Sequence, residues 1–138
     1  LFLIPDAETV FPFLLQDKLS EQGSNFKAGD LYLEQVIQDG QVLTGQNPWS
    51  VWKLSEDIIR ALGYTPKVRV ITPEENSVTL LAVYKELGYK QAKQHIQNHP
   101  VDYQEMLVLV HAVIAFMNFE LSQGTDLLFL TDSLKAEV

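Results

Sequence analysis

The sequence contains three histidines, and two of them have a spacing that suits metal coordination. His95 and His99 are four residues apart, so they would share one face of a helix. A zincin-type site places a glutamate directly after the first histidine, whereas residue 96 is isoleucine here. A charged histidine is also favoured near the C-terminus of a helix by the helix dipole. We therefore interpret the pair as a helix-end feature and predict no metal site.

The other residues that could do chemistry do not form a complete active site. His111 lies in a long apolar run, with Glu105 and Glu120 as the nearest acidic residues on either side, and a hydrogen-bonded core histidine is the commoner situation. No serine occupies a G-x-S-x-G elbow, and the sequence has no glycine-rich phosphate loop. The sequence has no cysteine, which excludes a disulfide framework and a thiolate metal site. We predict no cofactor.

The most informative stretch is residues 39–50, DGQVLTGQNPWS, which combines two turns, a short strand and a helix start. Asp39-Gly40 tolerates the positive φ angles of a tight hairpin and lies between two runs with strand propensity. Ser50 can accept a hydrogen bond from a free amide of the next helix, so we expect it to cap that helix. Between the strand and the cap, a sharp loop is favoured by Thr44, Gly45, Asn47 and Pro48.

This stretch resembles the DG-x-L-x-TGQNP-x-S segment near the end of ThiJ/PfpI domains, in the class I glutamine amidotransferase-like superfamily. Residues 11–19, FPFLLQDKL, with Gly23 and Phe26 after them, resemble the helix and strand that precede that segment in the family. The resemblance covers residues 1–64 and implies the C-terminal part of a flavodoxin-like α/β sandwich. The matching motif residues, whose expected task is to shape the last strand-to-helix turn, are Asp39, Gly40, Thr44, Gly45, Gln46, Asn47 and Pro48.

The resemblance also implies a chemistry that this sequence does not hold in full. ThiJ/PfpI enzymes use a cysteine on a strand-to-helix elbow, usually followed by histidine and assisted by an acidic residue. That elbow lies upstream of the matching segment, so the nucleophile and a small-molecule substrate site would require sequence before Leu1. Asp6 and Glu8 lie near the place of the supporting acid, and Glu8 is our candidate for it. A solvated loop carboxylate is the alternative.

Composition sets further limits on the class of protein. With 138 residues, 46% of them hydrophobic and 20% charged, we expect a soluble globular core. A net charge of −8 argues against nucleic acid as a partner, because phosphates must be neutralised by Lys and Arg. Residues 106–119 are apolar but number only about 14, where a membrane span needs roughly 20. We interpret them as a buried central helix and expect no membrane partner and a cytoplasmic location.

The pattern of apolar residues predicts an α/β first half. Residues 1–4 are expected to form a strand entered from the middle, because the chain starts without methionine, and we expect the sequence to be a fragment. A helix over residues 10–22, a short strand at 25–27 and the hairpin follow. Residues 48–62 repeat apolar side chains at helical spacing and end at Gly63, as the last helix of the family would.

The second half is expected to be a helical extension, beyond a linker at residues 65–71. Thr72-Pro73-Glu74-Glu75 is a capping box that predicts a helix ending near Gly88. A shorter helix should cover residues 89–98. A second start at Asp102 should open an apolar helix that stops near Gly124, with a last helix over residues 125–135.

These patterns predict a domain over residues 1–64, a linker at 65–71 and a helical extension over 72–138. The leading hypothesis is part of a ThiJ/PfpI-like protein with cysteine-dependent hydrolase, amidase or glyoxalase-type activity. The alternative is a non-catalytic scaffold in which the helical segment forms dimers or binds a partner, and we expect a homo-oligomer. An interface should then expose an apolar patch, for which Val108, Phe116 and Phe119 are the candidates.

Overall fold

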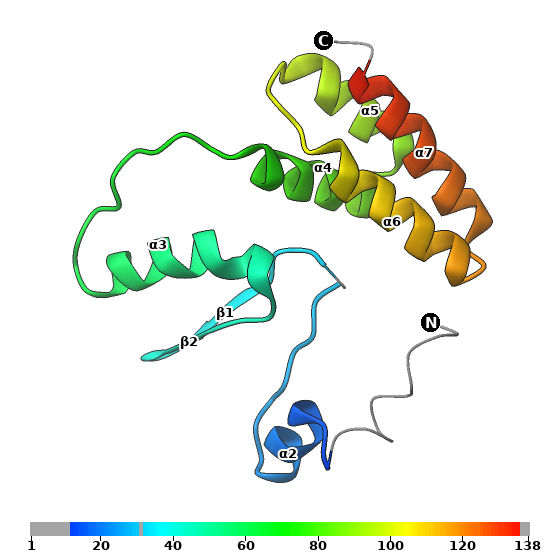
Figure 1. Cartoon of the computed structure of the whole chain (residues 1–138). Coiled ribbons are helices and arrows are strands. Elements are labelled where there is room, and N and C mark those ends of the chain that lie inside the picture. Colours follow the sequence, from blue (N-terminus) through cyan, green and yellow to red (C-terminus); the bar gives the residue numbers. More distant parts are fainter. Residues whose placement is uncertain (1–11, 31, 136–138) are drawn as a thin grey trace.

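The computed structural model describes residues 12–30 and 32–135 and is mainly helical (Figure 1). Strands β1 (Val36–Asp39) and β2 (Val42–Gly45) form the sheet of this described part. None of its helices combines the length and the apolar character that crossing a membrane requires. The helical elements are α2 (Leu15–Glu21), the 3-10 turn η1 (Pro48–Ser50), α3 (Val51–Ala61), α4 (Pro73–Leu87), α5 (Tyr89–Asn98), α6 (Glu105–Met117) and α7 (Leu121–Lys135).

The expected flavodoxin-like sandwich is wrong. Such a sandwich needs a parallel sheet covered by helices on both faces. Here β1 and β2 are consecutive and antiparallel, with Val36 opposite Gly45 and Asp39 opposite Val42. Residues 24–30, where we expected a short strand, have no regular secondary structure. A strand needs a neighbouring strand for its backbone hydrogen bonds. In the described part of the chain, such pairing occurs between β1 and β2 of the hairpin. The expected strand at residues 1–4 lies outside the described residues.

The hairpin and α3 pack together as one unit, residues 32–62, which we call the hairpin unit. The turn centres on Gly40 and Gln41, one residue later than predicted. Gly40 has φ 57°, at the first central position that a type II′ turn gives to glycine. Leu54 on α3 lies against β2, so closely that a Cβ at Gly45 would lie 3.1 Å from it. Glycine at this position therefore lets the helix approach the strand.

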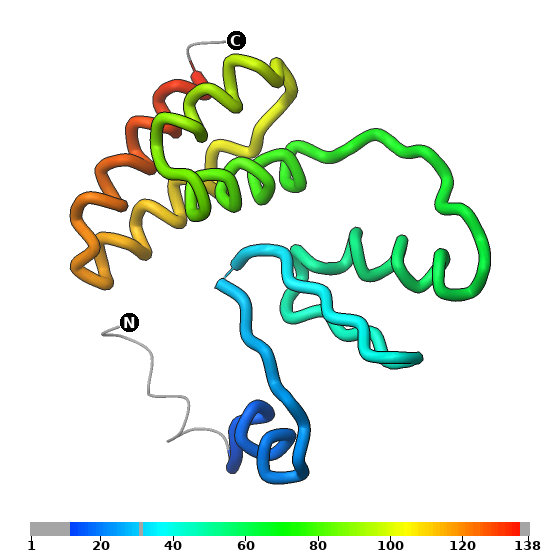
Figure 2. Tube along the Cα trace, turned by 180° about the vertical axis from the view of Figure 1, so that it is seen from behind, coloured from blue at the N-terminus to red at the C-terminus, as the bar shows by residue number. Residues whose placement is uncertain are grey.

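Helices α4 to α7 form a second unit, residues 72–135, which we call the helical unit. The predicted capping box is confirmed, because Thr72 Oγ1 accepts from the Glu75 amide and Glu75 accepts from the Thr72 amide. Helices α6 and α7 lie side by side and antiparallel in both ribbon views (Figures 1 and 2). The centre of the core is formed by fully buried side chains of all four helices: Leu80, Leu81, Ala92, Val108, Ala112, Leu127 and Leu130.

The apolar run that we expected to form one helix as far as Gly124 is broken earlier. Helix α6 ends at Met117, Phe119 adopts φ 62°, and α7 begins at Leu121. Gly124 lies inside α7, where an added Cβ would come within 2.7 Å of the Phe116 ring. This glycine is therefore a contact residue between two antiparallel helices and not a helix stop.

The start of α6 also differs from the prediction. The helix begins at Glu105 after Gln104, which makes no side-chain cap, so Asp102 is not the cap. Instead, the Gln104 amide donates to the Ser77 hydroxyl at 2.8 Å, and Ser77 is fully buried on α4. A tertiary contact with α4 therefore replaces the local cap that the sequence suggested.

An ion-pair bridge and a shared core residue are among the features that connect the hairpin unit with the helical unit. The guanidinium of Arg69, in the irregular segment between them, binds Glu56 of α3 and Glu75 of α4 at 3.1 and 2.6 Å. Leu33, just before the hairpin, is buried in the same core cluster as the helices. The predicted linker therefore carries an ion-pair bridge, and the hairpin unit contributes a side chain to the helical core.

Candidate functional site

The motif that carried the resemblance forms a backbone-binding loop. The Gln46 amide side chain accepts from the Gly29 amide at 2.6 Å and donates to the carbonyl oxygens of Gly29 and Asp30, each at 3.3 Å. Thr44 Oγ1 reaches the carbonyl of Ile37 at 3.5 Å across the hairpin. These side chains hold the segment before the hairpin against the end of β2.

Asn47 and Ser50 continue this network in a more buried position. Asn47 donates to the Leu33 carbonyl at 2.6 Å, and its Oδ1 accepts from the amide and the hydroxyl of Ser50. Ser50 is fully buried, and its Oγ accepts from the Gln35 amide at 3.0 Å. The expectation that Ser50 caps the helix is therefore wrong. Asn47 is the capping residue, because a 3-10 turn with Pro48 at its first position precedes α3.

These contacts account for most of the motif without invoking chemistry. Asp39 and Gly40 lie at the exposed hairpin end, and Gly45 admits Leu54, whereas Gln46 and Asn47 bind backbone groups. A structural role of the motif stays a prediction, which these contacts support. Glu8, our candidate for a supporting acid, and Asp6 lie outside the described residues.

His95 and His99 do share a face at the end of α5, where their rings stack with centroids 4.2 Å apart. His99 Nδ1 lies 3.0 Å from the carbonyl oxygen of His95. Burial, together with the nearby charge of His99, lowers the pKa of His95. Within the described ranges, no group of three or more potential metal-binding side chains occurs.

His111 is the chemically most unusual group of the helical core. It is buried on α6, and Nε2 has no hydrogen-bond partner among the described residues. The Tyr32 ring packs against it edge to face at 5.8 Å. Burial, and then the charge of Lys85, lowers the pKa of His111, so the imidazole stays neutral near pH 7. The predicted core position of His111 is confirmed, whereas the hydrogen bond expected for a core histidine is not found at Nε2 among the described residues.

The largest feature that the sequence interpretation missed is an exposed apolar stripe on α6. It consists of the exposed Met106, Val110 and Val113 and the half-buried Met117, which we call the α6 stripe. The opposite face of the helix holds Val108, which is fully buried and so was a wrong candidate for an exposed patch. Of the other candidates, Phe116 is half-buried and Phe119 is 76% exposed.

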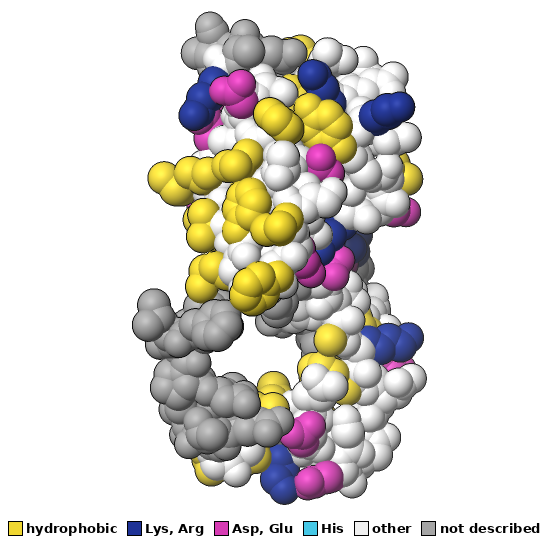
Figure 3. Space-filling view, turned by 90° about the vertical axis from the view of Figure 1, so that its right-hand side faces the viewer, with side chains coloured by type: hydrophobic (Ala, Val, Ile, Leu, Met, Phe, Trp, Pro, Cys, Tyr) yellow, Lys and Arg dark blue, Asp and Glu magenta, His cyan; other side chains and the backbone are white. Residues whose placement is uncertain are grey.

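Figure 3 shows hydrophobic side chains gathered on this side of the helical unit. Helix α7 also has exposed apolar side chains, which are Leu121, Leu128 and Phe129. Because α6 is apolar on two opposite faces, the sequence could not tell which face is buried. The spacing of the stripe, i, i+4, i+7 and i+11, was the signal that could have found it.

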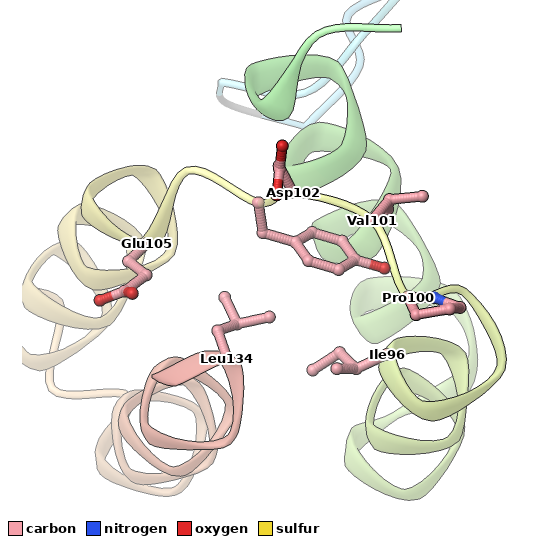
Figure 4. Close-up of a pocket in the computed structure, with 7 residues that line it drawn as sticks. Ile96, Pro100, Val101, Asp102, Glu105 and Leu134 are labelled. Atoms are coloured by element: carbon pink, nitrogen blue, oxygen red, sulfur yellow. The ribbon is translucent and has the colours of Figure 1, made fainter. Parts of the chain in front are cut away.

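A small cavity of about 220 Å³ opens where α5, the start of α6 and the end of α7 meet (Figure 4). Ile96 and Leu134 point toward one another across it, whereas the side chain of Asp102 points away from them. Pro100, Val101 and Glu105 complete the labelled rim. It is smaller than most ligand pockets and brings no acid–base pair together.

Comparison of this chain with protein-family models, curated proteins and solved structures finds no match.

Proposed function

We propose that this chain is a non-catalytic association module that pairs with a second copy of itself through the α6 stripe. The observation that carries the proposal is the exposure of Met106, Val110 and Val113, at 62, 42 and 50%, in one line along a helix. Contiguous apolar surface of this kind is typical of protein–protein contact sites. Covering it with protein removes apolar area from water, which favours association.

The chemistry of the α6 stripe favours a second copy over a charged partner. Helix α6 has Glu105 in its first turn, and its histidine, His111, faces the core, so the stripe itself carries no charge. A two-fold interface presents the same patch on both subunits, and an uncharged apolar patch is complementary to itself. The net charge of −8 on the chain makes less specific contacts between copies unfavourable.

The spacing of the stripe also fits helix–helix pairing. Side chains at i, i+4, i+7 and i+11 alternate steps of four and three residues, as in the contact seam of two packed helices. Phe119 and Leu121, exposed at the turn beyond the stripe, would extend the contact. The proposal keeps the cytoplasmic location expected from the sequence. A chain without cysteine forms no disulfide bonds and therefore does not need an oxidising compartment.

Light scattering after size exclusion tests this proposal. We expect the wild-type chain to show twice its 15.7 kDa mass, and Val113→Glu to show the single mass, because a buried charge would oppose pairing. Val68→Glu is the matched control, since this valine is fully exposed in the irregular segment. A wild-type chain that stays monomeric at about 100 μM, or a Val113→Glu variant that still dimerises, would contradict the proposal.

A second candidate is the cysteine-dependent enzyme that the ThiJ/PfpI resemblance implies. The observation in its favour is the ordered loop at Gln46 and Asn47, which supports a strand-to-helix turn like that expected of the family motif. Its nucleophile would lie outside this sequence. Intact-mass measurement after alkylation of the protein from its natural source tests it. A mass above 15.7 kDa with an alkylated cysteine supports the enzyme, and an unalkylated mass of 15.7 kDa rejects it.

A further inference from the structure

A cavity of about 460 Å³ lies between the hairpin unit and α4, and nothing in the association proposal uses it. Its size lies within the range of small-molecule sites, and so does its mixture of aromatic, aliphatic and a few polar side chains. Trp49 and Trp52 line it from the hairpin unit, and Val78 and Ile71 line it from α4 and the segment before it. Two carboxylates, Glu34 and Glu75, also border the cavity.

The two carboxylates differ in the number of hydrogen bonds and ion pairs that they make within the chain. Glu75 accepts from the amide and hydroxyl of Thr72 in the capping box, and from two nitrogens of Arg69 at 2.6 and 2.7 Å. Its charge and its lone pairs are therefore used within the chain. Glu34 has no hydrogen bond or ion pair to another described residue. A ligand would find one available carboxylate in this cavity.

The Glu34 carboxyl has charged neighbours of both signs. Burial raises the pKa of the Glu34 carboxyl, Lys53 opposes this, and the charges of Asp57, Glu75 and Glu56 raise it further. A positive group placed beside Glu34 would favour its charged form, and an anionic group would disfavour it.

The tryptophans supply the second half of a cation site. The face of an indole ring attracts a positive charge, and aromatic side chains with a carboxylate are a common way to hold a quaternary ammonium group. The Trp49 ring is already held edge to face against Tyr32, with centroids 5.3 Å apart. Its position therefore does not depend on a ligand to fix it.

We propose that this cavity binds a small organic cation, an alkylammonium or quaternary ammonium group, between the indoles of Trp49 and Trp52 and the carboxylate of Glu34. The site lies on the hairpin unit and α4, apart from the α6 stripe. Binding and association are thus separate properties of the chain.

Tryptophan fluorescence gives a direct test, because Trp49 and Trp52 are the two tryptophans of the sequence and both line the cavity. Choline would be titrated at constant ionic strength against 3,3-dimethylbutan-1-ol, its neutral isostere. We expect a saturable change with choline, half complete at or below about 10 mM, and binding of the isostere at least about fivefold weaker. Val113→Glu should bind choline as the wild type does, whether or not the chain associates.

Substitutions identify the carboxylate. We expect Glu34→Gln, which keeps the size of the side chain, to weaken choline binding at least about fivefold. Glu74→Gln is the control, since Glu74 is an exposed acid in the first turn of α4 that does not line the cavity. No saturable change with choline, equal binding of choline and its isostere, or equal effects of the two substitutions would each overturn the proposal.

Discussion

At the scale of single residues, the Asn47 side chain makes three hydrogen bonds in the turn before α3, one to the Leu33 carbonyl and two with Ser50. We expect Asn47→Ala to lower the free energy of unfolding by about 1–3 kcal/mol, because the Leu33 carbonyl loses its side-chain donor and the amide and hydroxyl of Ser50 lose their side-chain acceptor. Asn25→Ala, an exposed loop substitution of the same kind, should stay within about 0.5 kcal/mol. Urea denaturation followed by circular dichroism measures both. Equal effects of the two would show that the turn does not depend on this network.

The neutral imidazole of His111 makes a prediction about pH. Its pKa is lowered in the folded chain, so the unfolded chain takes up the proton at higher pH. The contribution of neutral His111 to the free energy of unfolding is therefore fully present above the ordinary histidine pKa of about 6.5. It is lost as the pH falls toward the lower pKa of the folded chain. We expect His111→Phe to lose less stability between pH 7.5 and 5.5 than the wild type does. Urea titrations at both pH values measure this, with His99→Gln as the control.

An unchanged pH dependence in His111→Phe would mean that this histidine does not couple folding to protonation.

Among single residues, the sequence correctly predicted glycine at the hairpin turn and the core position of His111. It misassigned the cap to Ser50, because the hydroxyl of Ser50 is taken by the Gln35 amide, a partner 15 residues away. A long-range hydrogen bond of this kind leaves no local trace in the sequence.

At the scale of elements, the contact between α6 and α7 depends on Gly124. Alanine usually stabilises a helix relative to glycine by up to about 1 kcal/mol. Here the added Cβ meets the Phe116 ring at 2.7 Å, and we expect Gly124→Ala to destabilise the chain by about 1–3 kcal/mol. In a Phe116→Ala background the same change should become neutral or stabilising. Denaturation of the four variants measures this coupling, and purely additive effects would contradict it.

The helices of the second half were largely predictable, and the sheet of the first half was not. Helices α4 and α5 follow from the capping box at Thr72 and from Gly88, whose φ of 87° separates them. Both signals depend only on residues that are close in sequence, so they can be recognised without the structure. The sandwich required partner strands that the described residues do not supply, so strand propensity alone was misleading. The break at Phe119 was also missed, because an apolar residue carries no stop signal.

At the scale of the whole molecule, the packing of the helices determines which apolar side chains are buried, and the sequence alone did not predict this. Helix α6 has apolar side chains on both faces, and only packing against α4 and α7 determines that Val108 is inside and Val113 outside. The cavity between Trp52 and Glu75 likewise joins residues on both sides of the irregular segment. The distance in sequence between these residues hides the cavity. It becomes visible when the hairpin unit and the helical unit are seen together.

In the proposed association, the α6 stripe of one chain contacts the α6 stripe of another. The sequence has no cysteine, so Val113→Cys creates a single reactive site in the middle of the stripe, and Val68→Cys creates one in the irregular segment. Cross-linking of each variant with a short flexible bismaleimide is the most direct measurement. We expect a covalent dimer for Val113→Cys at concentrations where Val68→Cys stays monomeric. Equal, low cross-linking of the two, with both cysteines open to a monofunctional maleimide, would contradict it.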